Sequence, residues 1–459
     1  METILIKFWI LFLIICFLID RTNSCGLFSK CFGCCKGWNI AEKVNGEVNR
    51  TKCVRQLSFN HTQSLQFSPI THKMSAVHNS AMLSVQQQHE NNQSNGSNTN
   101  RLISVPIEIS RSSILHIWLK TRSASQEVPA RIRIRHPSMD NVTVAKTDQH
   151  VEFEFHELSL QLEGPAKLEW TSADTHVSYI YVYEPENVLT RGIRPAFIAN
   201  AARFSDVREG YHFRPPLGWM NDPNGFSKFG DHFHLFYQHY PHALHWEAMH
   251  WGHAVSRDLV NWVHQPIFLL PDPAVGLEHA GSGGIYSGSA VVVTDGGGQR
   301  GPPTMVVFYT DSLTGRVPWQ FQRVVTTTGG IVPERPAITV IGEVPPGLGL
   351  REDFRDPNVF MGPDGRWKMV LSSKDKRGGV VLLYETTDKK MANWRFVGVL
   401  HRDSRLNTSV VECAALLPLT RRHNGGIAGT LWVLLYGQLD ALDPRTGRRN
   451  MSPASRRHV

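Results

Sequence analysis

The chain contains 459 residues, which is enough for two or three domains. Hydrophobic residues make up 41% and charged residues 19%, a balance typical of a globular protein. The formal net charge is +8, and much of the excess lies in the last stretch, at Arg445, Arg448, Arg449, Arg456 and Arg457. No aromatic residues alternate with these arginines, so we expect a solvated basic tail and no nucleic-acid partner.

The N-terminus has the pattern of a secretory signal. Lys7 precedes an apolar run, Phe8 to Ile19, and small polar residues follow at Thr22 to Ser24. The run is shorter than the ~20 apolar residues that a spanning helix needs, although a signal anchor is an alternative. We therefore predict a signal peptide at 1–24, and a secreted, extracellular protein with no membrane segment after its removal.

Residues 25–100 divide into a cysteine-rich segment and a polar linker. Five cysteines crowd the first part, at Cys25, Cys31, Cys34, Cys35 and Cys53. They favour a disulfide knot over a zinc site, because their spacing does not make two clean Cys-x-x-Cys pairs, and the pairing cannot be deduced. The run 86–97 is polar and predicts a disordered linker. Asn141 and Asn407 are among several sequons compatible with glycosylation.

Between residues 101 and 186 the pattern changes to apolar residues at every second position. Such alternation predicts half-buried strands, at 105–109, 114–119, 130–134, 151–155 and 177–183. No helical stretch interrupts them, so we predict a small antiparallel β-sandwich. Its aromatic residues are Trp118, Trp170, Tyr179, Tyr181 and Tyr183. They favour a packing role in or over the sandwich, with sugar stacking as the alternative. Residues 184–204 read as a connection.

A larger unit repeats over residues 205–459. Each unit begins with a short polar or acidic motif and continues through apolar strands. The four opening motifs are Asn221-Asp222, Tyr286 to Ser289, Arg355 to Pro357, and Val411 to Cys413. All-strand repeats of this length indicate a β-propeller, here with about four blades. Because the first strand of every blade lines the central channel, we expect Asp222, Asp356 and Glu412 to face one pocket.

The three acids are suited to cleaving a glycosidic bond. That reaction needs one ionised carboxylate beside the sugar and one protonated carboxyl that donates to the leaving oxygen. Apolar neighbours should raise the pKa of Glu412, which makes it the candidate acid, whereas amides at Asn221 and Asn224 should keep Asp222 ionised. We expect Trp219, Trp246 and Trp251 to line the same pocket. The alternative for each acid is a surface turn or an ion pair at a strand end.

Three motifs carry a resemblance to a known family. The stretches Trp219 to Gly225 (Trp-Met-Asn-Asp-Pro-Asn-Gly), Phe354 to Pro357 (Phe-Arg-Asp-Pro) and Glu412-Cys413 appear in order. They resemble the signature motifs of glycoside hydrolase family 32, the invertase, inulinase and levanase family of β-fructofuranosidases. The resemblance covers about 205 to 440 and does not reach the first 200 residues.

The resemblance implies a five-bladed β-propeller, a retaining mechanism, and sucrose or fructans as substrates, with no metal and no cofactor. It implies that Asp222 is the nucleophile, that Glu412 is the acid/base, and that Asp356 stabilises the transition state. The substrate-binding residues that it implies are Asn221, Gln238, Trp246, Tyr286, Ser287 and Arg355. For a retaining enzyme, the carboxyls of Asp222 and Glu412 should lie about 5–5.5 Å apart.

The chain departs from the family pattern at several positions near the expected sugar site. Tyr240 stands where the family usually has Asn, Glu247-Ala248 replaces Gly-Asn, and the third motif lacks its usual Trp and Pro. These departures bear on substrate preference. The sequence stops in or just after the fourth blade, so we expect an incomplete propeller that is a fragment, is closed by a partner chain or does not fold stably. The oligomeric state stays open.

Three other functions remain as alternatives to fructoside hydrolysis. The same site can pass a fructosyl group to another sugar, which the sequence cannot separate from hydrolysis. An inverting arabinan-type hydrolase can use the same propeller, although the motif set argues against it. A fragment without activity can still bind fructans. The histidines of 232–253 raise the further alternative of a metal site, but we expect them at polar strand and loop positions.

Overall fold

The computed structural model describes residues 100–123, 128–201, 212–272, 283–294, 302–313, 318–403, 410–423 and 426–439. The predicted signal peptide, cysteine-rich segment, polar linker and arginine-rich tail lie outside these residues. The described residues fall into two compact units, which divide between Thr339 and Val340. Each unit is described by itself. In the described part of the chain, no helix is long and apolar enough to cross a membrane.

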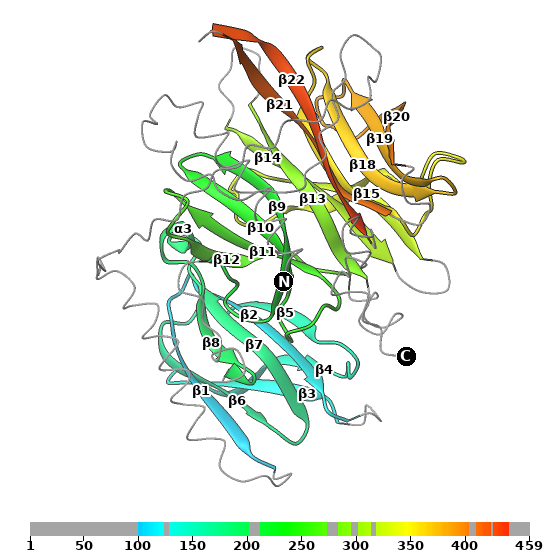
Figure 1. The fold of residues 1–459 in the computed structure, drawn as a ribbon. Helices are drawn as coiled ribbons and strands as arrows, with labels where there is room; N and C mark the ends of the chain where they lie inside the picture. Colours follow the sequence, from blue (N-terminus) through cyan, green and yellow to red (C-terminus); the bar gives the residue numbers. More distant parts are fainter. Residues whose placement is uncertain are drawn as a thin grey trace, which may run out of the picture. The chain divides into compact units, whose positions relative to one another are not determined.

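The first unit begins with two four-stranded antiparallel sheets, which pack as a β-sandwich (Figure 1). One sheet contains, in spatial order, β1 (Leu102–Ile109), β6 (Gly164–Thr171), β3 (Ala130–His136) and β4 (Met139–Thr147). The other contains β5 (Glu154–Ser159), β2 (Ile114–Thr121), β7 (Thr175–Tyr183) and β8 (Arg194–Ile198). The alternating apolar residues face inward, and Leu115, Ile132 and Leu168 are completely buried between the sheets.

Strand β7 is buried on both faces, because a second layer covers its outer side. Ile180 and Val182 point into the sandwich, so Tyr179, Tyr181 and Tyr183 point to the opposite face. These tyrosines and Trp118 are buried in a cluster that also contains residues from the blade that follows. The aromatic row therefore packs between the sandwich and the first blade and offers no open stacking face.

A short helix and β8 occupy the segment that the sequence suggested was a plain connection. Helix α3 (Val188–Arg191) packs on β12, and the backbone carbonyl of Val188 accepts a hydrogen bond from Gln265 at 2.8 Å. Gly192 ends the helix with φ at +67°, where a Cβ atom would collide with the backbone carbonyl of His264. The prediction missed β8 because this strand has little apolar alternation of its own and is fixed by pairing with β7.

Two four-stranded blades complete the first unit (Figure 1). The first blade is the antiparallel meander of β9 (Trp219–Phe229), β10 (His232–Tyr240), β11 (His250–Ser256) and β12 (Val263–Leu269). The second is formed by β13 (Gly284–Val293), β14 (Thr304–Leu313), β15 (Trp319–Thr327) and β16 (Glu334–Ile341). Their shared core contains Phe236, Trp251, Phe268, Met305 and Val307. The two blades thus pack face to face through large apolar side chains.

The second unit contains a third blade and a long hairpin. The blade consists of β17 (Phe354–Met361), β18 (Trp367–Asp375), β19 (Gly378–Thr386) and β20 (Arg395–Asp403), and the hairpin of β21 (Val410–His423) and β22 (Gly426–Leu439). The hairpin packs on the blade through Val411 and Ala414, which contact Val370 and Val381 in one apolar cluster. Ser372 also accepts a hydrogen bond from the Ala414 backbone N–H at 3.1 Å.

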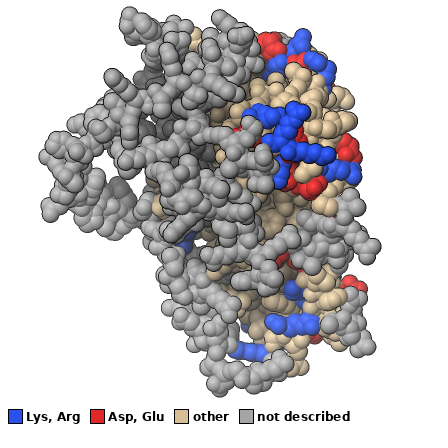
Figure 2. Space-filling model, turned by 45° about the vertical axis from the view of Figure 1, so that its right-hand side comes forward, with Lys and Arg blue, Asp and Glu red and all other residues tan. Residues whose placement is uncertain are grey.

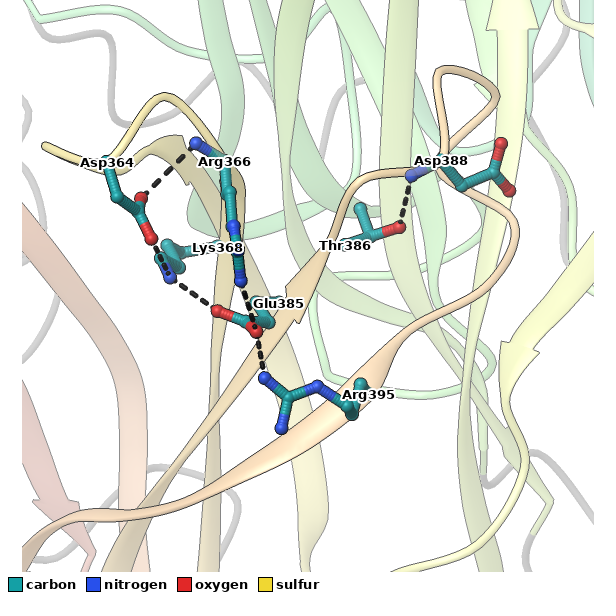
Figure 3. Close-up of polar contacts among 7 residues, drawn as sticks. All are labelled: Asp364, Arg366, Lys368, Glu385, Thr386, Asp388 and Arg395. Atoms are coloured by element: carbon teal, nitrogen blue, oxygen red, sulfur yellow. Dashed lines mark hydrogen bonds and ion pairs between the residues drawn. The ribbon is translucent and has the colours of Figure 1, made fainter.

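An ion-pair network joins three strands of the third blade (Figure 3). Glu385 on β19 accepts hydrogen bonds from Lys368 at 2.6 Å, from Arg366 at 3.2 Å, and from Arg395 on β20. Lys368 also donates to Asp364 at 2.7 Å. On the face drawn in colour in Figure 2, basic and acidic side chains are likewise interspersed, and no large field of one sign is visible.

The predicted fold class is confirmed: the described chain is all-β, with a β-sandwich followed by propeller-type blades. Three four-stranded sheets and one hairpin match the four predicted repeats in number and position. In every repeat the predicted opening motif lies on the first strand, which is an edge strand of its sheet in β9, β13 and β17.

Candidate active site

Each of the four opening strands carries a β-bulge at its predicted motif. The register slips between Tyr237 and His239 opposite β9, between Tyr286 and Gly288 on β13, between Arg355 and Asn358 on β17, and between Glu412 and Ala415 on β21. The residues that fall in the bulges include Asp222, Ser287, Asp356 and Cys413. Bulges re-aim side chains out of the regular alternation and are common beside active sites. The same distortion thus marks four motifs that lie far apart in the sequence.

Asp222 is held in place by two neutral donors. The side-chain amide of Asn221 donates to one carboxylate oxygen at 3.0 Å, and the hydroxyl of Ser287 donates to the other at 2.7 Å. Asn221 is itself oriented by the indole N–H of Trp219, at 2.8 Å. Asp222 is only 7% exposed, so these donors fix the carboxylate in a largely buried setting. The sequence prediction was half right, because the amide of Asn224 donates to the Asp222 backbone at 3.3 Å instead of to its carboxylate.

Two predicted pocket residues are tied into the packing between the first two blades. Trp251 is completely buried, and its indole N–H donates to the Tyr286 backbone carbonyl at 3.1 Å. The prediction that Trp251 lines an open pocket is therefore wrong. Gln238 is also buried, and its amide donates to the Ile285 carbonyl at 2.8 Å. Both side chains hold β13 against the first blade and so fix the strand that carries Ser287.

Trp246 and Tyr286 meet near the Asp222 cluster. Their rings are 5.8 Å apart between centroids and lie edge to face. Trp246 is on the loop between β10 and β11, and Tyr286 directly precedes Ser287 on β13. Both side chains are half-buried, so each keeps an accessible aromatic surface. Aromatic faces of this kind can pack against the apolar side of a sugar ring.

In the second unit, Arg355 links two acidic residues. Its guanidinium donates to Asp353 at 2.9 Å and to Glu412 at 3.2 Å. Burial disfavours the charged form of Arg355, but the carboxylates of Glu412, Asp356 and Asp353 outweigh it and raise the pKa of this arginine further above its ordinary value. Arg355 is therefore a permanent cation, and it orients Glu412, whose side chain is 25% exposed.

Asp356 holds the backbone next to Glu412. One of its carboxylate oxygens accepts a hydrogen bond from the backbone N–H of Cys413 at 2.6 Å. Asp356 and Cys413 have φ angles of +66° and +51°, in the left-handed region that few residues other than glycine adopt. Such strain persists where surrounding contacts enforce it, and it clusters at functional sites. The two bulges thus support each other and set the direction of Glu412.

The structure therefore brings the predicted residues together in two clusters. Asn221, Asp222 and Ser287, with Gln238, Trp246 and Tyr286 around them, belong to the first unit. Arg355, Asp356 and Glu412 belong to the second. That the two clusters meet around one sugar stays a prediction. Sequence reasoning missed Asp353, although an acid two positions before Arg355 on an extended strand lies on the same face.

No group of three or more His, Cys, Asp or Glu side chains among the described residues is arranged to hold a metal ion. The crowded histidines are instead part of the packing. His234 and His253 share a hydrogen bond of 3.0 Å, and His239 contacts the Trp219 backbone carbonyl at 2.9 Å. Burial lowers the pKa of His234 and of His239 to about 4, so both are neutral at pH 7.

Comparison with known protein families decides the classification. Residues 212–448, about half of the chain, match the N-terminal domain of glycosyl hydrolases family 32. The chain belongs to glycosyl hydrolases family 32. All three signature motifs, and the bulges that carry them, fall inside this family 32 segment.

Several characterised members are similar to the chain over this segment. A levanase of Bacillus subtilis (strain 168) is 38% identical over 49% of the chain and 31% of its own length. The vacuolar acid beta-fructofuranosidase 4 of Arabidopsis thaliana is 34% identical over 51% of the chain and 33% of its length. A sucrose:sucrose 1-fructosyltransferase of Festuca arundinacea is 35% identical over 46% of the chain and 31% of its length. The chain thus spans about a third of the length of these relatives.

A solved family 32 structure from Bifidobacterium adolescentis resembles the chain in fold. The TM-score is 0.59 at 22% identity, and the likeness covers 76% of this chain and 66% of the other. At this identity the likeness shows the fold alone.

Proposed function

We propose that the chain is a retaining glycosidase that cleaves terminal β-D-fructofuranosyl bonds of sucrose or fructans. One observation carries the proposal: all four opening strands bulge at their family 32 motifs, and the carboxylates in or beside these bulges are held by fixed donors. The named activities of the levanase and the acid beta-fructofuranosidase support the substrate class.

In the first step, the Asp222 carboxylate attacks the anomeric carbon, C2, of the fructosyl unit. The bond from C2 to the bridging oxygen breaks as Glu412 donates its proton to that oxygen, and glucose or a shortened fructan leaves. The donors from Asn221 and Ser287 orient Asp222 for this attack. The product of this step is a fructosyl ester of Asp222.

In the second step, water attacks C2 while the Glu412 carboxylate takes a proton from it. The ester bond breaks, Asp222 is released as a carboxylate, and fructose leaves with its original configuration. Arg355 and Asp356 offer charged groups for the fructose hydroxyls. Arg355 also holds Glu412 through both steps, because its 3.2 Å contact does not depend on the substrate.

Fructosyl transfer is a second candidate, supported by the similarity to the Festuca arundinacea fructosyltransferase. It uses the same first step and differs only in the acceptor of the second. A sugar hydroxyl then attacks C2 in place of water, and the products are a longer fructan and no free fructose.

The test is product analysis with sucrose, inulin and levan on the purified full chain. We expect free fructose, released first as the β-anomer. Asp222→Asn should lower kcat by roughly 10⁴–10⁶-fold, as loss of a nucleophile does in other enzymes. Glu412→Gln should lower it by about 10²–10⁴-fold. A nitrophenyl β-fructofuranoside has a leaving group that needs no proton. With this substrate, Glu412→Gln should still release nitrophenol in the first step, whereas Asp222→Asn should not.

Each other outcome identifies a different function. Longer fructans without free fructose would establish transfer, and an inverted anomer would establish an inverting hydrolase. Binding of inulin without any product would establish a fructan-binding protein.

A further inference from the structure

The loop between β10 and β11, residues 241–249, lies at the end of the first blade that carries Asp222. Before the loop, Tyr240 pairs with Trp219, the first residue of β9. After it, Met249 forms a parallel bridge with Gly284 at the start of β13. Both ends are therefore anchored to the strands that carry Asp222 and Ser287. Trp246, near the middle of the loop, reaches Tyr286.

The β-sandwich contacts the root of this loop. The His242 ring is hydrogen-bonded to the hydroxyl of Ser178 on β7 at 2.8 Å. It also packs against Phe153, which precedes β5, with ring centroids 4.6 Å apart. The neighbouring Glu152 makes a side-chain hydrogen bond to Tyr240. Two consecutive residues of a sandwich loop thus fix the two residues on either side of Pro241.

Charged side chains of the sandwich and of the loop also interact. Burial raises the pKa of Glu152, and the Lys120 cation offsets part of this shift while the Glu247 carboxylate adds to it. Lys120 also lies over the Phe153 ring, 4.6 Å from its centroid. The residues Tyr240 and Glu247 and the sandwich loop therefore form one interacting group.

The middle of the loop has little other support. Leu244 is 56% exposed, and the His245 side chain is 66% exposed and contacts only Glu247 and the Tyr240 ring among its described contacts. A loop without such anchors samples several conformations, and small displacements of a substrate-binding group lower its effect strongly.

We propose that the β-sandwich positions Trp246 for substrate, with Glu152 as the positioning residue that acts through Tyr240. The inference rests on the proposed function in one respect, namely that Trp246 contacts the fructosyl donor. It assigns the sandwich to the substrate side of the enzyme, and it makes the sandwich loop a determinant of affinity for sucrose or fructan. The sandwich itself does not touch the reacting atoms.

The experiment compares Glu152→Ala and Tyr240→Phe in the full chain. Each removes one hydrogen bond and should raise KM by about 2–10-fold with kcat nearly unchanged. The KM of the double variant should be no higher than that of either single variant, because both changes remove the same contact. Glu152→Gln keeps an oxygen acceptor and should restore KM. In parallel, amide hydrogen exchange over residues 241–249 should speed up in Glu152→Ala.

The control is Glu169→Gln, which alters a buried acid in the other sheet of the sandwich, where Glu169 pairs with Arg135 at 2.7 Å. It should lower the thermal midpoint and leave both KM and loop exchange unchanged. Unchanged loop exchange in Glu152→Ala would overturn the proposal, as would faster exchange with unchanged KM. If the unaltered chain releases no fructose, the proposed function fails, while loop exchange still decides whether the sandwich holds the loop.

Discussion

The two compact units hold their candidate catalytic acids by different means. In the first, Asp222 is nearly buried, and a neutral amide and a neutral hydroxyl donate hydrogen bonds to it. In the second, Glu412 is more exposed and is held by the Arg355 guanidinium. A carboxylate that must form and release a bond to carbon needs a fixed direction, whereas a proton carrier also needs access to water. The contrast therefore agrees with the roles proposed for the two acids.

The contrast extends to the packing around each acid. The first blade is lined with buried, neutral histidines, whereas the third blade relies on ion pairs such as the Glu385 network. Acidification should therefore act on the two units in different pH ranges. Acid weakens both the packing around neutral histidines and the ion pairs, but the histidine packing should weaken first as the pH falls.

The largest expected effect is the loss of stability of the first unit on acidification. Burial lowers the pKa of His239 to about 4 and of His250 to about 3, from ordinary values of 6.5. Between about pH 6.5 and pH 4, these histidines are therefore protonated in the unfolded chain and neutral in the folded unit. Stability is fully present above about pH 6.5 and falls toward pH 4, by about 1.4 kcal/mol per pH unit for each such histidine.

In the second unit, the hydrogen bond from Lys368 leads the interactions that lower the pKa of Glu385 below its ordinary 4.5, so this contribution is lost only below about that pH. Peptide-resolved hydrogen exchange from pH 7 to pH 4, corrected for intrinsic rates, measures both units at once. Equal loss of protection in the two units above pH 5 would contradict the comparison.

The next effect concerns Arg355. Arg355→Gln leaves Glu412, Asp353 and Asp356 without their shared cation, and breaking a buried pair of this kind costs about 3–5 kcal/mol. Urea unfolding measures the loss. Glu385→Gln is the matched control, because two of the basic partners of Glu385, Arg366 and Arg395, are exposed, so that this change should lower stability less. Equal losses in the two variants would show that Arg355 contributes no more to stability than an ion pair with exposed partners.

The smallest effect concerns Ser287. Ser287→Ala removes the hydroxyl donor on Asp222, and loss of a hydrogen bond to a charged group corresponds to a loss of about 10–100-fold in kcat. Ser287→Thr keeps the hydroxyl and should retain most of the activity. If Ser287→Thr lowers kcat as far as Ser287→Ala does, steric fit at β13 matters more than the hydroxyl donor. Steady-state kinetics with sucrose decides between them.

Local sequence patterns predicted much of the fold. Alternation along 130–134 and 177–183 placed strands β3 and β7, and repeated opening motifs placed the first strand of each blade. The patterns could not show which element packs on each face of a sheet. Period-two alternation shows which residues share one side of a strand, but it does not identify the element that contacts that side. The pattern therefore placed the tyrosines of β7 in one row but could not show that this row packs against the first blade. Trp251 was misplaced for the same reason.

The candidate site was predicted in its residues but only partly in its contacts. Asp222 and its neighbour Asn221 are adjacent, so their hydrogen bond was foreseeable. Ser287 lies 65 residues from Asp222, and Arg355 lies 57 residues from Glu412. Such pairs depend on how strands are brought together, which one sequence does not reveal. The bulges had a local signal that was not used, because Pro223 and Pro357 lack the N–H that regular pairing requires.

Those bulges have a further consequence for the solubility of the chain. Strands β9 and β17 are edge strands, and an edge with a regular row of free donors and acceptors can recruit a strand from another molecule. The irregular register interrupts that row at the middle of each edge. The bulges that aim the carboxylates thus also make these edges poor templates for aggregation.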